Sequence, residues 1–138
     1  MQCEHWDRGA CRSCRYLDVP YGEQVAAKSE TAAEALALVT LGGAGDNIVA
    51  SPSLYGGTTN LLTHTLPRLG IEARFVDDPS DPAAWAALAD ERTIAFFGET
   101  IPNPRGDILD IEAISAAAHE LGIPLVVDNT VASPFLTR

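Results

Sequence analysis

The stretch Ile123-Pro124-Leu125-Val126-Val127-Asp128-Asn129-Thr130 joins a short apolar run directly to a carboxylate, an amide and a hydroxyl. A continuous apolar run without alternation is typical of a strand buried on both faces, as in a parallel sheet. Its polar end is then expected at the carboxyl edge of the sheet, where open α/β proteins bind their ligands. Two interpretations of Asp128 follow: a ligand-binding carboxylate, or a cap of the next turn through backbone N–H groups.

The composition is that of a globular protein of ordinary domain size, with 138 residues, 46% hydrophobic and 20% charged. No run approaches the length of a membrane span. The amino terminus has neither the basic nor the apolar region of a secretion signal, so we expect a cytoplasmic location. The net charge of −10 argues against a general nucleic-acid-binding surface, and nucleic acid is not an expected partner.

Charge and cysteine content divide the sequence into two predicted segments, residues 1–28 and residues 29–138. The first has no net charge and contains every cysteine, whereas the second carries the entire acidic excess. Cys3, Cys11 and Cys14 have the spacing C-x7-C-x2-C, at which thiolates can bind zinc or an iron–sulfur cluster. A closed site usually needs four ligands, so three free cysteines are the alternative interpretation.

Residues 1–28 resemble the amino terminus of bacterial ribosomal RNA (uracil-5-)methyltransferases. The resemblance rests on Met1-Gln2-Cys3, Gly9-Ala10-Cys11-Arg12-Ser13-Cys14 and Gln24-Val25-Ala26-Ala27-Lys28. It implies that Cys3, Cys11 and Cys14 match three ligands of a [4Fe–4S] cluster. The fourth cysteine and the methyl-donor-binding and catalytic regions of that family have no counterpart here, so the resemblance indicates an origin more than an activity.

From residue 29 onward, helix signals alternate with strand signals, which predicts βαβ units and a parallel sheet in an α/β fold. Candidate caps support two of the helices: Asp81 precedes a proline at the first helical position, and Asp110 precedes an amphipathic stripe. The expected helices cover residues 31–41, 56–69, 82–89 and 111–121. The expected strands cover residues 48–50, 71–76 and 93–97 and the run that ends at Asp128.

Polar residues follow three of these strands and are expected to meet at one edge of the sheet, as a cofactor site requires. They are Ser51, Ser53 and Tyr55 after the first strand, Glu99, Thr100 and Asn103 after the third, and Asp128, Asn129 and Thr130 after the last. Tyr55 offers a flat ring beside two glycines, although a tyrosine in a simple glycine-rich turn is the alternative. Asn103 lies between two prolines, and a turn asparagine is its alternative. The P-loop and the dinucleotide fingerprint are both missing.

Four ordered motifs in residues 31–138 resemble the Cys/Met-metabolism family of pyridoxal-phosphate (PLP) enzymes, in particular the O-acetylhomoserine sulfhydrylases. The motifs are Ser53-Leu54-Tyr55-Gly56-Gly57-Thr58, Glu99-Thr100-Ile101-Pro102-Asn103-Pro104, Asp110-Ile111-Glu112-Ala113-Ile114 and Val127-Asp128-Asn129-Thr130.

The resemblance implies part of a fold-type-I PLP-transferase large domain and a small amino-acid substrate. It implies that Asp128 pairs with the protonated pyridine nitrogen of PLP, that Tyr55 stacks on the ring, that Asn103 binds near the phenolic oxygen and that Thr130 supports the site. The parent reaction makes homocysteine from O-acetylhomoserine and sulfide.

Taken with the methyltransferase-like start, the resemblance leads us to expect a fused fragment, and two departures from the family pattern lead us to expect that it is inactive alone. The lysine that forms the Schiff base is absent, because Lys28, the single lysine of the chain, matches no family position. Ser29-Glu30-Thr31 stands where the family has a Ser-Gly-Gln or Ser-Gly-Met phosphate cradle. A metal-binding module and a non-catalytic interaction protein that self-associates through exposed surface are the alternatives.

Overall fold

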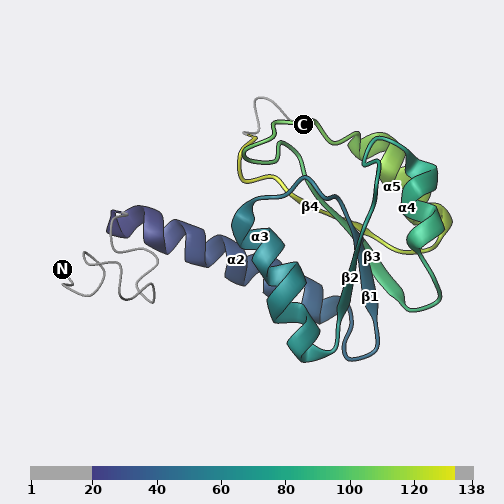
Figure 1. Cartoon of the computed structure of the whole chain (residues 1–138), viewed down its shortest axis with the longest axis horizontal. Helices are drawn as coiled ribbons and strands as arrows, with labels where there is room; N and C mark the ends of the chain where they lie inside the picture. The colour runs from purple at the N-terminus through teal and green to yellow at the C-terminus, as the bar shows by residue number, and fades with distance from the viewer. Residues whose placement is uncertain (1–19, 133–138) are drawn as a thin grey trace.

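A computed structural model describes residues 20–132 of the chain (Figure 1). Helices and strands alternate along this part, as the sequence predicted. The helices are α2 (Tyr21–Leu41), α3 (Gly56–Asn60), α4 (Pro82–Leu88) and α5 (Ile111–Glu120), with a π-helical turn η1 (Leu61–Thr65) and a 3-10 turn η2 (Leu66–Leu69) directly after α3. The strands are β1 (Asn47–Ala50), β2 (Glu72–Phe75), β3 (Thr93–Glu99) and β4 (Leu125–Asp128).

The four strands form one parallel sheet in the order β2-β1-β3-β4. Strands β1 and β3 lie in the centre, and their apolar residues are buried except for Ile94, which is partly exposed. Because the strands are parallel and joined by helical crossovers, the carboxyl ends of all four lie at the same edge. The predicted α/β class and parallel sheet are therefore confirmed.

Helices cover both faces of the sheet and form two apolar cores. One core packs α2, η1 and η2 against β1, β2 and β3, and the other packs α4 and α5 against β1 and β3 (Figure 1). Trp85 of α4 is fully buried in the second core, where its ring lies 5.3 Å from that of Phe96. Its indole N–H donates a hydrogen bond to the Pro79 carbonyl, so the buried polar atom of this ring is satisfied.

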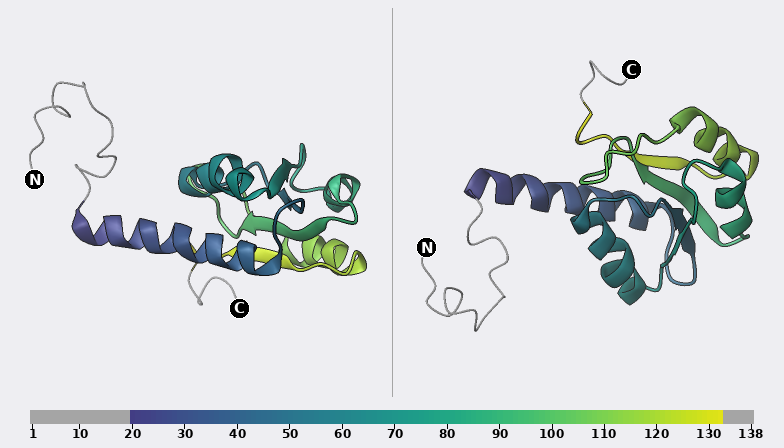
Figure 2. Two further views of the ribbon diagram at one scale, coloured as in Figure 1. Left: turned by 90° about the horizontal axis from the view of Figure 1, so that it is seen from below. Right: turned by 45° about the horizontal axis from the view of Figure 1, so that its top comes forward.

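Helix α2 differs most from the sequence prediction. It begins at Tyr21, ten residues before the predicted start at Thr31, and it ends at Leu41 as expected. Pro20 stands at its N-cap, and the residues that follow include good helix formers, which explains the longer helix. The amino-terminal half of α2 extends beyond the rest of the fold (Figure 2). The predicted division between residues 28 and 29 falls inside this continuous helix.

Two predicted helix caps are confirmed. The carboxylate of Asp81 accepts a hydrogen bond from the Ala83 N–H at the start of α4, and the carboxylate of Asp110 accepts one from the Ala113 N–H at the start of α5. The single helix predicted over residues 56–69 is instead a succession of α, π and 3-10 turns. Pro67 contributes to this irregularity because it has no N–H to donate within the last turns.

Strand β4 is not buried on both faces, contrary to the prediction from its sequence. Each of its residues is partly exposed, because β4 is an edge strand that pairs with β3 alone in the part of the chain that the structure describes. Helix α2 also exposes apolar side chains, with Leu36 67% and Val39 36% exposed. The expected exposed apolar surface is thus present, whereas self-association itself stays a prediction. Over residues 20–132, no helix has the length and apolar character needed to span a membrane.

Candidate functional site

The carboxyl ends of β1, β3 and β4 meet in space, as the order of polar residues along the sequence predicted. The backbone N–H of Tyr55, after β1, donates a hydrogen bond of 2.7 Å to Oε1 of Glu99 at the end of β3. The hydroxyl of Thr100 donates one of 2.7 Å to Oδ1 of Asn129, after β4. These two contacts link the three strand ends into one polar edge.

Asp128 is half-buried at the last position of β4, on the boundary between the core and this polar edge. Its Oδ1 accepts hydrogen bonds from the backbone N–H and the hydroxyl of Thr130, at 2.8 and 2.6 Å. This is the turn-capping geometry that was one of its two interpretations. The cap engages Oδ1 and fixes the orientation of the carboxylate, so capping the turn is compatible with a role in binding.

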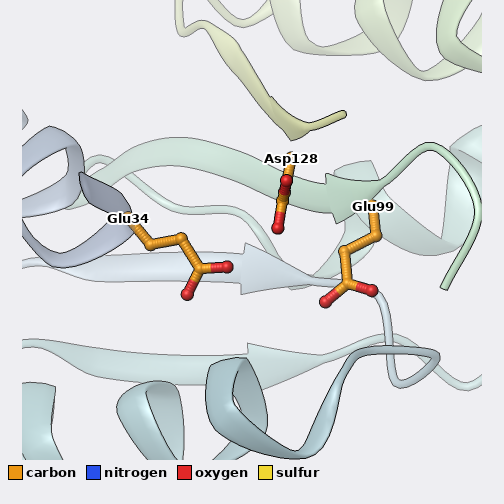
Figure 3. A group of neighbouring side chains, drawn as sticks. All are labelled: Glu34, Glu99 and Asp128. Atoms are coloured by element: carbon orange, nitrogen blue, oxygen red, sulfur yellow. The ribbon is translucent and has the colours of Figure 1, made fainter. Parts of the chain in front are cut away.

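Three carboxylates from three different elements gather beside the sheet edge: Glu34 of α2, Glu99 of β3 and Asp128 of β4 (Figure 3). One oxygen of each lies within 4.8 Å of one oxygen of the others, and we call these three residues the carboxylate cluster. Glu34 is only 8% exposed and Glu99 only 5%. Like charges at this separation in a buried setting repel one another, so the cluster favours a cationic group nearby.

Sequence reasoning did not identify Glu34 as a site residue. It is the only charged residue between Thr31 and Leu41, in a stretch that is otherwise apolar or carries hydroxyls. A charged residue on the sheet-facing side of such a helix is costly to bury without partners, and that pattern was the available signal. Only the fold places it near Glu99 and Asp128, because α2 crosses the sheet edge at this point.

A hollow of about 450 Å³ opens beside the carboxylate cluster. It has apolar walls and a polar end, which is typical of small-molecule sites. Its lining residues are Ala33, Glu34, Ala37, Phe97, Val126, Val127, Asp128, Asn129 and Thr130.

A second hollow of about 220 Å³ lies over the loops that follow β1, β2 and β3. There the hydroxyl of Ser53 donates a hydrogen bond of 2.7 Å to Oδ2 of Asp107 and accepts one of 3.2 Å from the Arg105 guanidinium. This network ties the loop after β1 to the loop after β3.

Only some of the predicted site residues line the larger hollow. Asp128 and Thr130 line the larger hollow. Tyr55 lines neither hollow, and its backbone is bonded to Glu99, which lines the smaller one. Asn103 is exposed in the loop after β3 and lines neither of these two hollows. The predicted ligands Cys3, Cys11 and Cys14 lie outside the described residues.

Residues 20–138 match the family model described as Cys/Met metabolism PLP-dependent enzyme. The chain belongs to this family. The match includes residues 20–28, which the sequence analysis had assigned to the cysteine-containing segment. The resemblance of the amino-terminal residues to ribosomal RNA methyltransferases finds no support in this match, and the iron–sulfur cluster stays a prediction.

Curated relatives in the Cys/Met metabolism family narrow the resemblance to sulfhydrylases. The O-acetyl-L-homoserine sulfhydrylase of Corynebacterium glutamicum is 51% identical over 114 residues, which cover 83% of this chain and 26% of the relative. The homocysteine synthase of Schizosaccharomyces pombe is 52% identical over 108 residues, covering 77% of this chain and 24% of the relative. The chain thus spans about a quarter of the length of these relatives.

Solved structures from the same group share the fold. A Campylobacter jejuni protein described as an O-acetylhomoserine (thiol)-lyase, which carries N'-pyridoxyl-lysine-5'-monophosphate, superposes with a TM-score of 0.74 at 42% identity, over 77% of this chain and 26% of that one. The O-acetylhomoserine sulfhydrylase of Wolinella succinogenes gives a TM-score of 0.68 at 43% identity, over 80% of this chain and 30% of that one.

The segment predicted to correspond to the phosphate cradle of the Cys/Met metabolism family does not begin a helix in this structure. Ser29-Glu30-Thr31, which the sequence analysis aligned with the phosphate cradle, lies in the interior of α2, because the helix begins at Tyr21. N–H groups in a helix interior are bonded to carbonyls four residues earlier, whereas a phosphate site needs the free N–H groups of a helix start. The described residues therefore fit the pyridine ring of PLP at Asp128, and they do not fit its phosphate at Ser29-Glu30-Thr31.

Proposed function

We propose that this chain forms one wall of a PLP site in an enzyme of the O-acetylhomoserine sulfhydrylase type, and that it is not catalytic by itself. The whole enzyme would convert O-acetylhomoserine and sulfide to homocysteine and acetate. When bound, PLP supplies an electron sink for such chemistry. Asp128 would hold the proton on the pyridine nitrogen, and Thr130 would keep the Asp128 carboxylate oriented.

The observation that carries the proposal is the placement of Asp128 in the larger hollow, which Glu34 also lines, with Glu99 close to both. One oxygen of each of the three carboxylates lies within 4.8 Å of one oxygen of the others, which makes one end of an otherwise apolar hollow strongly negative. A protonated pyridine ring, which is flat, apolar and cationic at one atom, matches both features. Tyr55 would contribute its ring face, since its backbone is bonded to Glu99 at the same edge.

Inactivity of the chain alone follows from its residues. Schiff-base formation and the later proton transfers need a lysine amine, and Lys28 is the single lysine of the sequence. It lies six residues before Glu34 on α2, about 9 Å along the helix axis by the helical rise. The phosphate contribution to affinity should also be missing, because no helix start faces the hollow at Ser29-Glu30-Thr31.

The test is a titration of the pure chain with PLP and, separately, with pyridoxal, followed by visible spectroscopy. We expect saturable spectral changes with both ligands and dissociation constants within a few-fold of each other, because the phosphate is not held. The variant Asp128→Asn should abolish the change. The matched control Asp77→Asn, at an exposed aspartate outside both hollows, should preserve it.

Three results would overturn parts of this proposal. A wild-type chain without a saturable change would remove the binding site altogether. A preference for PLP over pyridoxal of a hundredfold or more would show that the phosphate is held after all. Borohydride reduction that traps the ligand on Lys28, mapped by peptide mass analysis, or homocysteine formation by the pure chain, would end the claim of inactivity.

A further inference from the structure

The turn that carries Tyr55 has little internal means of holding its shape. Helix α3, which continues directly into η1, begins with two glycines, Gly56 and Gly57. Its N-cap position, occupied by Tyr55 itself, has no side-chain cap hydrogen bond. Glycines lower the cost of leaving the helical conformation, and an uncapped first turn frays readily. Contacts from outside α3 must therefore fix this segment.

Glu99 provides the first of these contacts. It ends the central strand β3, is only 5% exposed, and accepts the Tyr55 N–H at 2.7 Å. A charged acceptor makes a stronger hydrogen bond than a neutral one, and a strand end is a rigid support. The bond therefore ties the backbone of the first residue of the turn to the sheet.

Glu34 of α2 provides the second contact, at the other end of the segment. Its Oε1 accepts a hydrogen bond of 2.9 Å from the hydroxyl of Thr58, and both residues are almost fully buried. Thr58 closes the first turn of α3, three residues after Tyr55. Two buried carboxylates on two separate elements, α2 and β3, thus hold the two ends of the segment Tyr55–Thr58.

The ring of Tyr55 follows the backbone of this segment closely. A Cβ atom added at Gly57 would lie 2.7 Å from Cε1 and 3.1 Å from Cδ1 of the ring, so the ring packs directly over Gly57. A shift of the turn would carry the ring with it. The ring position is therefore determined by the same two carboxylates that hold the backbone.

We propose that Glu34 and Glu99 are positioning residues for Tyr55, which hold its ring at the edge of the sheet that also carries Asp128. The relevance of this position to a pyridine ring rests on the proposed function. The positioning itself does not, because it concerns contacts within the chain. Of the two carboxylates, Glu99 fixes the position of the Tyr55 backbone, and Glu34 fixes the position of the helical turn that follows.

The test uses the full chain labelled with 3-fluorotyrosine and observed by fluorine NMR without ligand. The chain has three tyrosines, and loss of a resonance in Tyr55→Phe assigns the one of interest. In Glu99→Ala and Glu34→Ala, we expect the Tyr55 resonance to move toward its position in the urea-unfolded chain while the other two stay. Glu99→Gln, which keeps an acceptor oxygen, should restore the wild-type position. Glu91→Ala, at an exposed glutamate, is the matched control.

A milder pair keeps the test informative if the alanine variants do not fold. Thr58→Val removes the donor to Glu34 at nearly constant volume, and Thr58→Ser retains the hydroxyl. We expect the Tyr55 resonance to move in Thr58→Val and to keep its wild-type position in Thr58→Ser. Two results together would overturn the proposal. The first is a Tyr55 resonance that does not move in folded Thr58→Val, and the second is identical spectra for Glu99→Gln and Glu99→Ala.

Pyridoxal titration of the same variants separates this inference from the proposed function. Because Glu99 also belongs to the carboxylate cluster, the informative comparison is between two variants that both lack its charge, and we expect about tenfold weaker binding in Glu99→Ala than in Glu99→Gln. If the resonance moves as expected and even the wild type binds no pyridoxal, the proposed function fails and the positioning stands. If the wild type binds and Glu99→Ala binds as well as Glu99→Gln, the positioning role toward a ligand fails.

Discussion

The side-chain amide of Asn47 donates a hydrogen bond of 2.8 Å to Oδ1 of Asp90, 43 residues further along the chain. The side-chain oxygen Oδ1 of Asn47 accepts a second hydrogen bond, of 2.7 Å, from the hydroxyl of Thr93. Arg74 donates to the other oxygen of Asp90 at 2.7 Å. This network joins the amino ends of β1 and β3 to the edge strand β2, at the end of the sheet opposite the carboxylate cluster.

Replacing Asn47 should destabilise the fold without affecting the candidate site. Asn47 is only 2% exposed, and Asn47→Ala removes the acceptor of the buried Thr93 hydroxyl and one of the donors to the Asp90 carboxylate. The expected loss is about 1–3 kcal/mol of unfolding free energy. Urea denaturation followed by circular dichroism measures it, with the exposed Asn60→Ala as control. An equal loss in both variants would contradict a specific role for this network.

Acid should weaken the same network. The hydrogen bond from Arg74, supported by those from Asn47 and the Arg92 backbone, lowers the pKa of Asp90 from 3.8 to about 2. A lowered pKa in the folded state contributes stability that is present above the unfolded value and is lost as the pH falls through the folded value. Asp90→Asn should therefore be less stable than wild type at neutral pH, with a difference that shrinks between about pH 4 and about pH 2.

Urea midpoints of both proteins across this pH range test the prediction, and Asp77→Asn controls for a general effect of lowered acidity. A difference between wild type and Asp90→Asn that stays constant down to about pH 2 would exclude the linkage.

Gly57→Ala should move the Tyr55 ring while leaving the helix intact. The new Cβ would lie 2.7 Å from the ring, closer than real contacts allow, whereas a Cβ at the neighbouring Gly56 meets nothing within 4 Å. Alanine favours helix over glycine by about 1 kcal/mol, so neither variant should lose helical structure. We expect weaker pyridoxal binding in Gly57→Ala and wild-type binding in Gly56→Ala. Equal affinities in the two variants would place the ring outside the binding site.

Gly70→Ala should cost more stability than Gly43→Ala. Gly70 ends η2 in the left-handed conformation, at φ 82°, and a Cβ there would lie 2.8 Å from Cβ of Ala44. The conformation alone costs about 1 kcal/mol for a residue with a side chain, and the close contact adds to it. Gly43 has no atom within 4 Å of a built Cβ. Thermal unfolding of the two variants gives the comparison, and similar melting temperatures would refute the prediction.

Local patterns were sufficient to predict most of the fold. The caps at Asp81 and Asp110, the glycines after helices and the apolar runs act within a few residues, so the sequence reveals them directly. The edge position of β4 was not predictable, because burial on both faces depends on which strands are neighbours in space. The predicted start of α2 is wrong because the change in composition near Ser29 indicates a boundary that the helix does not respect, whereas Pro20 is the start signal that the helix uses.

The candidate site was predictable only where its residues directly follow strands. Asp128 and Thr130 lie in one such run, and the rule that strand ends carry ligands placed them correctly at the polar edge. Glu34 comes from a helix and reaches the site through the crossing of α2 over the sheet, a relationship that no local spacing encodes. Asn103 shows the converse, because a stiff loop after β3 carries it to an exposed position.

The parallel arrangement of the strands gives the two ends of the sheet different tolerances to sequence change. The network around Asn47 and Asp90 at the amino ends maintains the scaffold, whereas Tyr55 and Asp128 lie at the carboxyl ends, in the loop after β1 and at the last position of β4. In a saturation mutagenesis screen, substitutions at the first end should reduce protein abundance, and substitutions at the second should reduce ligand occupancy at unchanged abundance. A designer could therefore vary the loops after β1, β3 and β4 to bind new ligands while the sheet and its stabilising network stay unchanged.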